Sequence, residues 1–560
     1  MNANPDRRIA KADLYRTLFL CELEQLSAFS FGGSESSSNT DMDVAVDGAG
    51  SVRYRGSSLA GALLATARTF LEVPRFVSRG FGGDDKSAPG SGAGAAFDEP
   101  PSIVCVDHAI PVHGAGQCTP RREPRAGNRH VHAGRVGDTG GLFDFEVLPK
   151  GLRWRFLIDV DHAARAPEDG ASAAGIVALV LREWQRERCW LGRRVARGLG
   201  WMRLAECSIV LLPRTEDYID RWPNAEPASI DARHGLVRTL MGGGAGFAYK
   251  GPAALDDYLA DRGTDLPELR PRRIYVRWQV QAVAGPYMAP DADGKSRAYG
   301  LDALSIGGHG SAMVPAEAIQ DRWVRVAEQR WDRFAAGCEP DTQLAFTHAY
   351  GTAGPAPVLQ ASGVAGALRH WQARGQRAAG ESALDPSTGV RYSAAGPAAA
   401  GPDISSELFG AMEKGGHPSR LLLRDGHLEH GQHDCWRIAL LEKLALDEFR
   451  QSALDSVKYD RLAILQGRWT FDLVQEVREA APGEWMDDAK CREAVGRAIA
   501  PVQAWLAAGA RREIGFGGGE FRAYGHLELV VRAPVSWALA GHEWAPWDDG
   551  GDHRSGEATA

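Results

Sequence analysis

Three aspartates in one short loop are the residues of this chain with the clearest chemical potential. Asp41 and Asp43 stand two positions apart, so their carboxylates lie on the same side if the segment is extended, and Asp47 follows. Carboxylates in this arrangement can hold a divalent cation such as Mg²⁺. The plainer interpretation is that all three are ordinary turn residues in a polar loop.

Clustered arginines are the second chemical feature. Arginine suits phosphate because its planar fork can engage two oxygens at once. One loop contains Arg121, Arg122, Arg125, Arg129 and Arg135, and another contains Arg193, Arg194 and Arg197. A net charge of −8 does not exclude phosphate binding, because that binding depends on local charge. The alternative is two solvated loops whose arginines pair with neighbouring acids.

A third candidate is a group of potential zinc ligands. His113, Cys118, His130 and His132 lie within 20 positions and could supply a tetrahedral site. Their spacing matches no standard zinc finger, so RNA contact or plain solvation is favoured over Zn²⁺. The chain also lacks the Gly-x-Ser-x-Gly and His-Glu-x-x-His motifs of common hydrolases.

Strands and helices must position these residues. The alternation of residues 17–31 predicts a half-buried strand that ends at Gly32, and Ser57 is expected to cap a helix from Leu59 to about Leu71. Further strands are predicted at 103–106, 152–160, 201–204 and 208–212, and a helix at 176–190. The tryptophans at 184, 190 and 201 are expected to fill the core.

Length and composition place the chain in a broad class. With 560 residues it is too long for one ordinary core, so two or more domains are expected. No run of about 18 apolar residues appears, which argues against a membrane span. The eight cysteines are scattered without a Cys-x-x-Cys pair, which favours a reducing, cytoplasmic location.

The second half of the chain repeats landmarks of the first in the same order. Residues 361–369 mirror 56–64, and Gly525 mirrors Gly200. Between these, Asp425 is aligned with Asp107, and Gly467 with Gly151. Four landmarks in one order predict two homologous modules, at 12–215 and 270–535. The segment 216–269 is then a linker, 380–403 a flexible insertion and 536–560 a disordered tail.

Within each module, strands alternate with helices, which predicts an α+β fold of the split β-α-β type with the helices on one face of a sheet. The order strand, Gly-Gly, Asp-bearing loop, Gly56-Ser57-Ser58 and helix resembles the start of a RAMP-superfamily protein. It is similar to the backbone-forming RAMP subunits of type III CRISPR effector complexes. The likeness continues through 141–151 and 192–200, and more loosely through 361–369, 408–410 and 513–529.

The resemblance implies two tandem ferredoxin-like (RRM-like) modules with inserted loops, assembled along a guide RNA beside other subunits of an effector complex. It implies that the Gly-Ser-Ser turn and the glycine-rich loop lie against RNA backbone, where glycine permits close approach and a helix start offers unpaired N–H groups. Base pairing would then read the sequence. The RNA-binding residues implied or suggested are Arg53, Arg55, Gly56, Ser57, Ser58, Gly61, Arg125, Arg129, Arg193, Arg194, Arg197, Gly198, Gly200, Ser362, Arg369 and Arg522.

In catalytic members of that family, an aspartate of the loop cuts target RNA with a divalent metal. The match places Asp41 at that position, with Asp43 beside it and Mg²⁺ as the cofactor. For the second module, Asp291, Asp293 and Asp302 are alternatives. Three hypotheses follow. The first is a guide-RNA-binding backbone subunit in antiviral defence, with or without metal-dependent cleavage of target RNA. The second is a non-catalytic scaffold or capping subunit, and the third is an unrelated zinc-dependent hydrolase.

Overall fold

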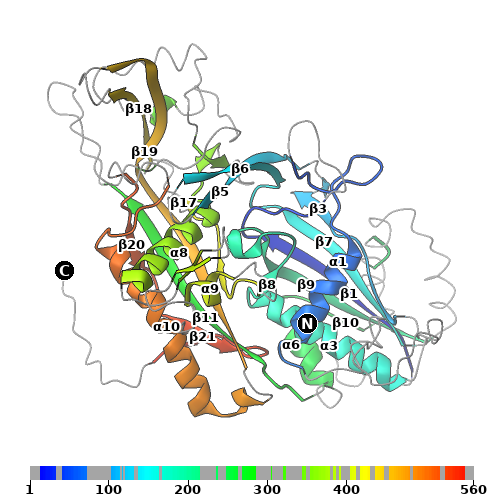
Figure 1. The fold of residues 1–560 in the computed structure, drawn as a ribbon. Coiled ribbons are helices and arrows are strands. Elements are labelled where there is room, and N and C mark those ends of the chain that lie inside the picture. Colours follow the sequence, from blue (N-terminus) through cyan, green and yellow to red (C-terminus); the bar gives the residue numbers. More distant parts are fainter. Residues whose placement is uncertain are drawn as a thin grey trace, which may run out of the picture.

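The computed structural model describes the chain in segments (Figure 1). These are residues 13–32, 41–71, 102–113, 116–117, 120–131, 136–162, 167–214, 235–237, 247–262, 266, 268–285, 304, 320–322, 344–347, 354–378, 383–385, 390–392, 404–410, 417–428, 436–446, 453–479, 483–517 and 524–548. The expected mixture of helix and sheet is confirmed, and the sheets are antiparallel. We call residues 13–262 the first half and residues 268–548 the second half.

The first half is built on an antiparallel sheet with two helices on one face. Its central strands lie in the order β9 (Trp201–Pro213), β1 (Leu14–Gln25), β7 (Arg153–Asp161) and β2 (Val104–Val106). Helix α1 (Gly56–Ala67) connects β1 to β2, and α3 (Pro167–Gln185) connects β7 to β9. Along the chain the order is therefore β-α-β-β-α-β.

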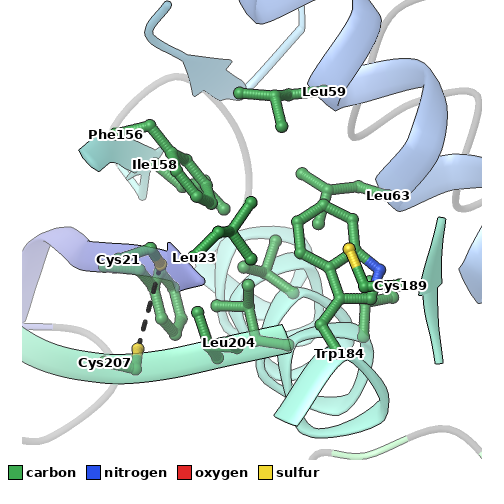
Figure 2. Close-up of a cluster of buried hydrophobic side chains, with 14 of the residues drawn as sticks. Cys21, Leu23, Leu59, Leu63, Phe156, Ile158, Trp184, Cys189, Leu204 and Cys207 are labelled. Carbon is green, nitrogen blue, oxygen red and sulfur yellow. Dashed lines mark hydrogen bonds between the residues drawn. The ribbon is translucent and has the colours of Figure 1, made fainter. Parts of the chain in front are cut away.

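Alternation along the strands and a four-residue spacing in the helices create the first core (Figure 2). Cys21 and Leu23 of β1 face the helices, as do Phe156 and Ile158 of β7. They meet Leu59 and Leu63 of α1 and Trp184 of α3. The burial of Trp184 and Trp201 confirms the prediction that these tryptophans fill the core, and Trp190 is partly buried against it. Cys21 and Cys207 lie opposite each other as free thiols, with 3.9 Å between their sulfur atoms.

The second half has the same order of strands and helices. Strand β11 (Arg273–Ala284) is followed by α8 (Ala361–Ala378), β16 (Leu421–Leu423), β19 (Ala453–Arg478), α10 (Asp488–Ala510), and then β20 (Glu528–Val531) and β21 (Ser536–Leu539). In the sheet, β20 and β21 both pair with β11, β11 pairs with β19, and β19 pairs with β16. Pro534 lies between β20 and β21, where a continuous strand would need a backbone N–H.

Equivalent hydrogen bonds show which residues of the two halves correspond. Gly200 and Gly525 accept equivalent bonds, from Leu191 N–H and Phe516 N–H. The N–H of Gly56 donates to His108, and that of Ala361 donates to Asp425. Asp425 therefore corresponds to His108 and not to Asp107, so the alignment predicted from sequence is wrong by one residue there.

The glycine alignment at 151 and 467 is also displaced by one residue. Trp154 pairs with Leu23, and Trp469 pairs with Ala282. These two strand positions in turn pair with Leu204 and Leu529. Trp154 and Trp469 are therefore equivalent, and both are fully buried. Gly467 then corresponds to position 152 rather than to Gly151.

A β-hairpin is inserted between the second and third core strands of each half. In the first half it consists of β5 (Glu123–Val131) and β6 (Val136–Val147), and in the second of β18 (Arg437–Leu446) and the first part of β19. Figure 1 shows the β18–β19 hairpin extending well beyond its sheet. The shorter elements are β3 (Ile110–His113), β4 (Gly116–Gln117), β8 (Cys189–Trp190), β10 (Phe247–Tyr249), α6 (Ala254–Arg262), β12 (Phe346–Thr347), β13 (Ala356–Pro357), β14 (Ala383–Asp385), β15 (Val390–Tyr392), α9 (Ile404–Phe409), β17 (His427–Leu428) and β22 (Ala545–Pro546).

Two predicted boundaries need correction. Residues 536–548 are not a disordered tail, because they include β21 and β22 and Trp544 packs against the first core. The predicted linker 216–269 includes α6, whose Leu255 and Tyr258 belong to the first core. Within the predicted flexible insertion 380–403, the structure describes the two-stranded sheet β14–β15.

The first half packs on the helix-free face of the second sheet. Tyr275 of β11 and Val474 of β19 point to that face and join the first core. Arg277 of β11 bonds Glu187 of the first half at 2.7 Å. Among the described residues, no helix has both the length and the apolar character needed to cross a membrane.

Candidate nucleic-acid interface

The glycine-rich loop 191–200 is held tightly against the segment that follows β1. The N–H of Arg193 donates to Ser30 O at 2.9 Å, and the N–H of Gly200 donates to Ala28 O at 2.7 Å. Gly192, Gly198 and Gly200 all have positive φ, which L side chains rarely adopt. The backbone bonds therefore fix the loop, and its arginine side chains are presented from a rigid base.

Gly200 is expected to be irreplaceable for stability. A Cβ there would lie 1.8 Å from Leu191 O, at φ +72°. We expect Gly200→Ala to lower the free energy of unfolding by about 2–4 kcal/mol. Gly61 is a matched control, because it is exposed within α1 and an added Cβ meets nothing within 4 Å. Gly61→Ala should stabilise by about 0.5–1 kcal/mol in the same denaturant titration, and equal effects of the two changes would contradict the role of Gly200.

Three arginines of this loop gather beside the base of the first hairpin. The guanidinium of Arg194 lies over the rings of Phe143 and Phe145, with its carbon 4.4 Å from each ring centroid. Arg193 lies against Gly32, where a Cβ would come 2.2 Å from its Nη2 atom. Arg197 ends the short 3₁₀ turn Val195–Arg197. Cation–π contact and the missing side chain of Gly32 thus hold two of the three guanidinium groups in place.

The electrostatics of this cluster favour an anion. Desolvation lowers the pKa of Arg194, and the nearby charges of Arg197 and Arg193 lower it further. The surface of Arg197 is exposed, but the dense protein around its guanidinium desolvates the charge and lowers its pKa. Within the described segments, none of these three arginines forms an ion pair with a carboxylate. Within the described residues these three like charges have no counterion, and a bound phosphate would stabilise them.

The start of α1 lies next to the same loop. Tyr54 lies beside the backbone of Gly192 and the side chain of Ser58, and burial raises the pKa of Tyr54 to about 12. The two motifs singled out in the sequence are thereby brought together. Ser57 and Arg55 are exposed at this helix start, and Ser58 is exposed as well.

The expected cap of α1 is wrong, and two of the predicted RNA-binding residues at the helix start already have partners within the protein. Ser57 does not cap the helix, because Arg55 is the N-cap residue and no side chain caps it. The N–H of Gly56 donates to His108 Nδ1 at 2.9 Å, so this amide is already used. Arg53 pairs with Asp47 at 2.5 Å. The surface that remains for a ligand is therefore made by Arg55, the two serines and the loop arginines.

The aspartate loop is bound to the hairpin strand that carries the two phenylalanines. Asp41 Oδ2 accepts a bond from the N–H of Asp144 at 3.0 Å, and the N–H of Asp41 donates to Asp144 O at 3.1 Å. Asp47 accepts bonds from the N–H groups of Ser51 and Ala49 and pairs with Arg53, and these contacts lower its pKa, with Ser51 the largest cause. Asp47 is thus the turn residue of the plainer interpretation.

A metal site does not emerge from the placed residues. No group of three or more His, Cys, Asp or Glu side chains suited to a metal occurs in the described part of the chain. One Asp41 oxygen accepts a bond from a backbone amide. Mg²⁺ is usually held by one or two carboxylates together with waters and substrate phosphates, so Mg²⁺ at Asp41 and Asp43 stays a prediction, and we derive no cleavage step from it. Of the zinc candidates, Cys118 and His132 lie outside the described residues, as do the side chains of His113 and His130.

In the second half, the predicted binding residues have structural contacts. Arg369 is buried and donates to Gly410 O at 3.2 Å. The N–H of Ala361 is bonded to Asp425, and Ser362 is partly exposed beside it. Arg522, the side chain of Arg129, and the alternatives Asp291, Asp293 and Asp302 lie outside the described residues.

Two predicted RNA contacts of the first half instead join the halves. Arg125 of the first hairpin is buried and pairs with Asp425 at 2.5 Å. Gly198 lies so close to the second half that a Cβ would come 2.2 Å from Asp425 Oδ1. Asp425 was not identified as functional from sequence, nor were Tyr54, Phe143 and Phe145. The alternation Phe143-Asp144-Phe145 places both rings on one face of β6, and this pattern in the sequence could have identified the two phenylalanines.

The helix-free face of the first sheet offers little to a nucleic acid. Glu22 pairs with Arg153 and Arg155, and Glu24 pairs with Arg203. Opposite charges neutralise each other there, so the loop arginines are the stronger candidates for phosphate. No protein-family model matches the chain, and neither does any curated protein.

Proposed function

We propose that this protein binds single-stranded RNA, as a guide-RNA-binding backbone subunit of a type III-like CRISPR interference complex. In this proposal, the two halves are tandem RAMP modules of ferredoxin-like fold. Support comes from their shared β-α-β-β-α-β order and from strands arranged fourth, first, third, second in both sheets. A hairpin inserted at the same point of each half adds to this support.

The observation that carries the proposal is the arginine cluster Arg193, Arg194 and Arg197. It lies on a loop with fixed backbone, beside an exposed helix start, and within the described residues no carboxylate neutralises it. A ribose-phosphate strand is a ligand that such a surface fits. Because the charges on the first sheet face are paired with each other, the proposal assigns RNA to the loops rather than to the strands.

Substitution of the exposed loop arginines tests this proposal. We expect Arg193→Gln with Arg197→Gln to weaken binding of a fluorescent single-stranded RNA about tenfold in an anisotropy titration. The slope of log K against log salt should become shallower by about 1.4, since each lost phosphate contact on a single strand removes about 0.7. Arg497→Gln is the matched control, because Arg497 pairs with Glu493 on an exposed helix surface. An unchanged affinity in the double variant, or an equal loss in the control, would count against the proposal.

A non-catalytic scaffold is the second candidate, favoured by the engagement of Asp41 with the Asp144 amide. RNA binding is then independent of the metal. We expect EDTA, or Asp41→Asn, to change RNA affinity by less than about twofold, because the loop arginines and not a cation bind the phosphates. Incubation of the complex with labelled target RNA and Mg²⁺ separates the two candidates: cleavage that Asp41→Asn abolishes excludes the scaffold.

A further inference from the structure

Helix α6 occupies a groove between α3 and β9 in the first half. Its side chains Leu255, Tyr258 and Leu259 are buried, and the Tyr258 ring meets Phe19 of β1 edge-on, with 5.9 Å between centroids. Two polar contacts from α3 hold it in place. Arg182 lies 3.7 Å from Asp256, and Gln185 Nε2 donates to Pro252 O at 3.0 Å.

Among the described residues, no helix fills the corresponding groove of the second half. By the strand registers, Phe19 corresponds to Trp278 and Leu204 to Leu529. The offset of 325 that relates Gly200 to Gly525 places Ala507 and Ala510 at the positions of Arg182 and Gln185. All four second-half residues line one cavity of about 590 Å³ between α10, β20 and the segment 533–535. The cavity thus lies where α6 packs in the first half.

An apolar side chain on this groove is exposed to solvent. Val531, which lies on the same face of β20 as Leu529, is 44% exposed, whereas the neighbouring Val530 lies on the opposite face of the strand and is 36% exposed. Val531 lies opposite Val280 of β11 and lines the cavity. An apolar surface that gathers in a groove marks an interaction site more often than a scattered exposed valine does.

We propose that this groove binds an amphipathic helix of a partner protein. The template is α6, which gives a helix of about two turns with leucine or tyrosine anchors four residues apart. Ala507 replaces Arg182, so the guest helix does not need the acid that Asp256 supplies, and a small or apolar residue fits there. Among the described helices only α10 lines this groove, so we assign its guest to another protein.

A tethered helix tests whether the groove accepts this guest. The probe is the α6 sequence 251–262 with Asp256→Ala, attached after residue 560 of the full chain by a flexible Gly/Ser linker of about 20 residues, which provides a local concentration near the millimolar range. We expect hydrogen exchange at residues 528–531 to slow at least about tenfold. The matched controls are the same probe with Leu255→Asp and Leu259→Asp, and the intact probe on a Val531→Asp chain. Unchanged exchange, or equal slowing with either control, would overturn the proposal.

Photo-cross-linking identifies the source of the helix. Position 531 is replaced by p-benzoylphenylalanine, and the protein is irradiated after assembly with its neighbouring gene products. A cross-link to a helical, leucine- or tyrosine-containing segment of another protein supports the proposal. Cross-links confined to this chain, or to a second copy of it, overturn it, because they make the occupant one of its own segments. Neither experiment involves RNA, so both outcomes are independent of the function proposed above.

Discussion

Replacing Asp425 with alanine is expected to lower the free energy of unfolding by about 3–5 kcal/mol. Asp425 is fully buried where three elements meet. One carboxylate oxygen pairs with Arg125 of the first hairpin at 2.5 Å, and the other accepts the Ala361 N–H at the start of α8 at 3.0 Å. The variant leaves a buried guanidinium without its counterion, and this desolvated charge accounts for most of the loss.

Chemical denaturation of two further variants separates the buried charge from the rest. Arg125→Met with Asp425→Leu removes both charges, so we expect it to cost less than Asp425→Ala alone. Glu493→Ala breaks an ion pair whose partners are each about two-thirds exposed, and it should change stability by less than about 0.5 kcal/mol. A double variant as unstable as Asp425→Ala would show that packing, and not the unpaired charge, dominates at this junction.

Trp469→Ala and Trp154→Ala are expected to cost about 3–5 kcal/mol each. Both indoles are fully buried at equivalent positions of the third core strand. Each also makes one hydrogen bond, Trp154 Nε1 to Gln25 at 3.0 Å and Trp469 Nε1 to Pro357 O at 3.1 Å. The two losses should be similar, because the cavity and the unmet partner are alike in both halves.

The pattern of unfolding adds a readout of how the halves depend on each other. Tyr275 and Val474 of the second half lie in the first core, so we expect either variant to lower the midpoint of a single transition followed by tryptophan fluorescence. For the conservative changes Trp469→Phe and Trp154→Phe, the loss in the free energy of unfolding should be less than half of the loss for the corresponding change to alanine. Two separated transitions, with only one of them moved, would contradict this coupling.

The sequence predicted the mixture of strands and helices, and much of their order, because both depend on local periodicity. Glycine identities at 200 and 525 aligned correctly, since each glycine has the same backbone requirement in its loop. The alignments of Asp107 with Asp425 and of Gly151 with Gly467 were displaced by one residue. Identical letters were matched there, whereas the structure matches hydrogen-bond partners, and His108 and Asp425 accept the same N–H.

The candidate site shows the same division. The sequence identified the loop arginines and the serines at the start of α1, and the structure places them next to each other through Tyr54. The sequence also suggested Arg125 and Arg369 as RNA-binding residues. In the structure both are buried, Arg125 in an ion pair and Arg369 in a hydrogen bond to a backbone carbonyl. An arginine in a loop has the same local signature whether its partner is a phosphate or a carboxylate.

The sequence by itself determined the glycine turns and the strands and helices of strong local periodicity, because those choices depend on neighbours a few residues away. It missed α6 and β21, which are stabilised by contacts with distant segments. Only the tertiary structure decided which charges are neutralised and which surfaces are covered. Arg125 and its partner Asp425 are 300 residues apart, and α6 covers its groove in one half while no described helix covers the equivalent groove in the other. Pairing and burial arise from contacts between distant segments, and local composition does not encode the partner.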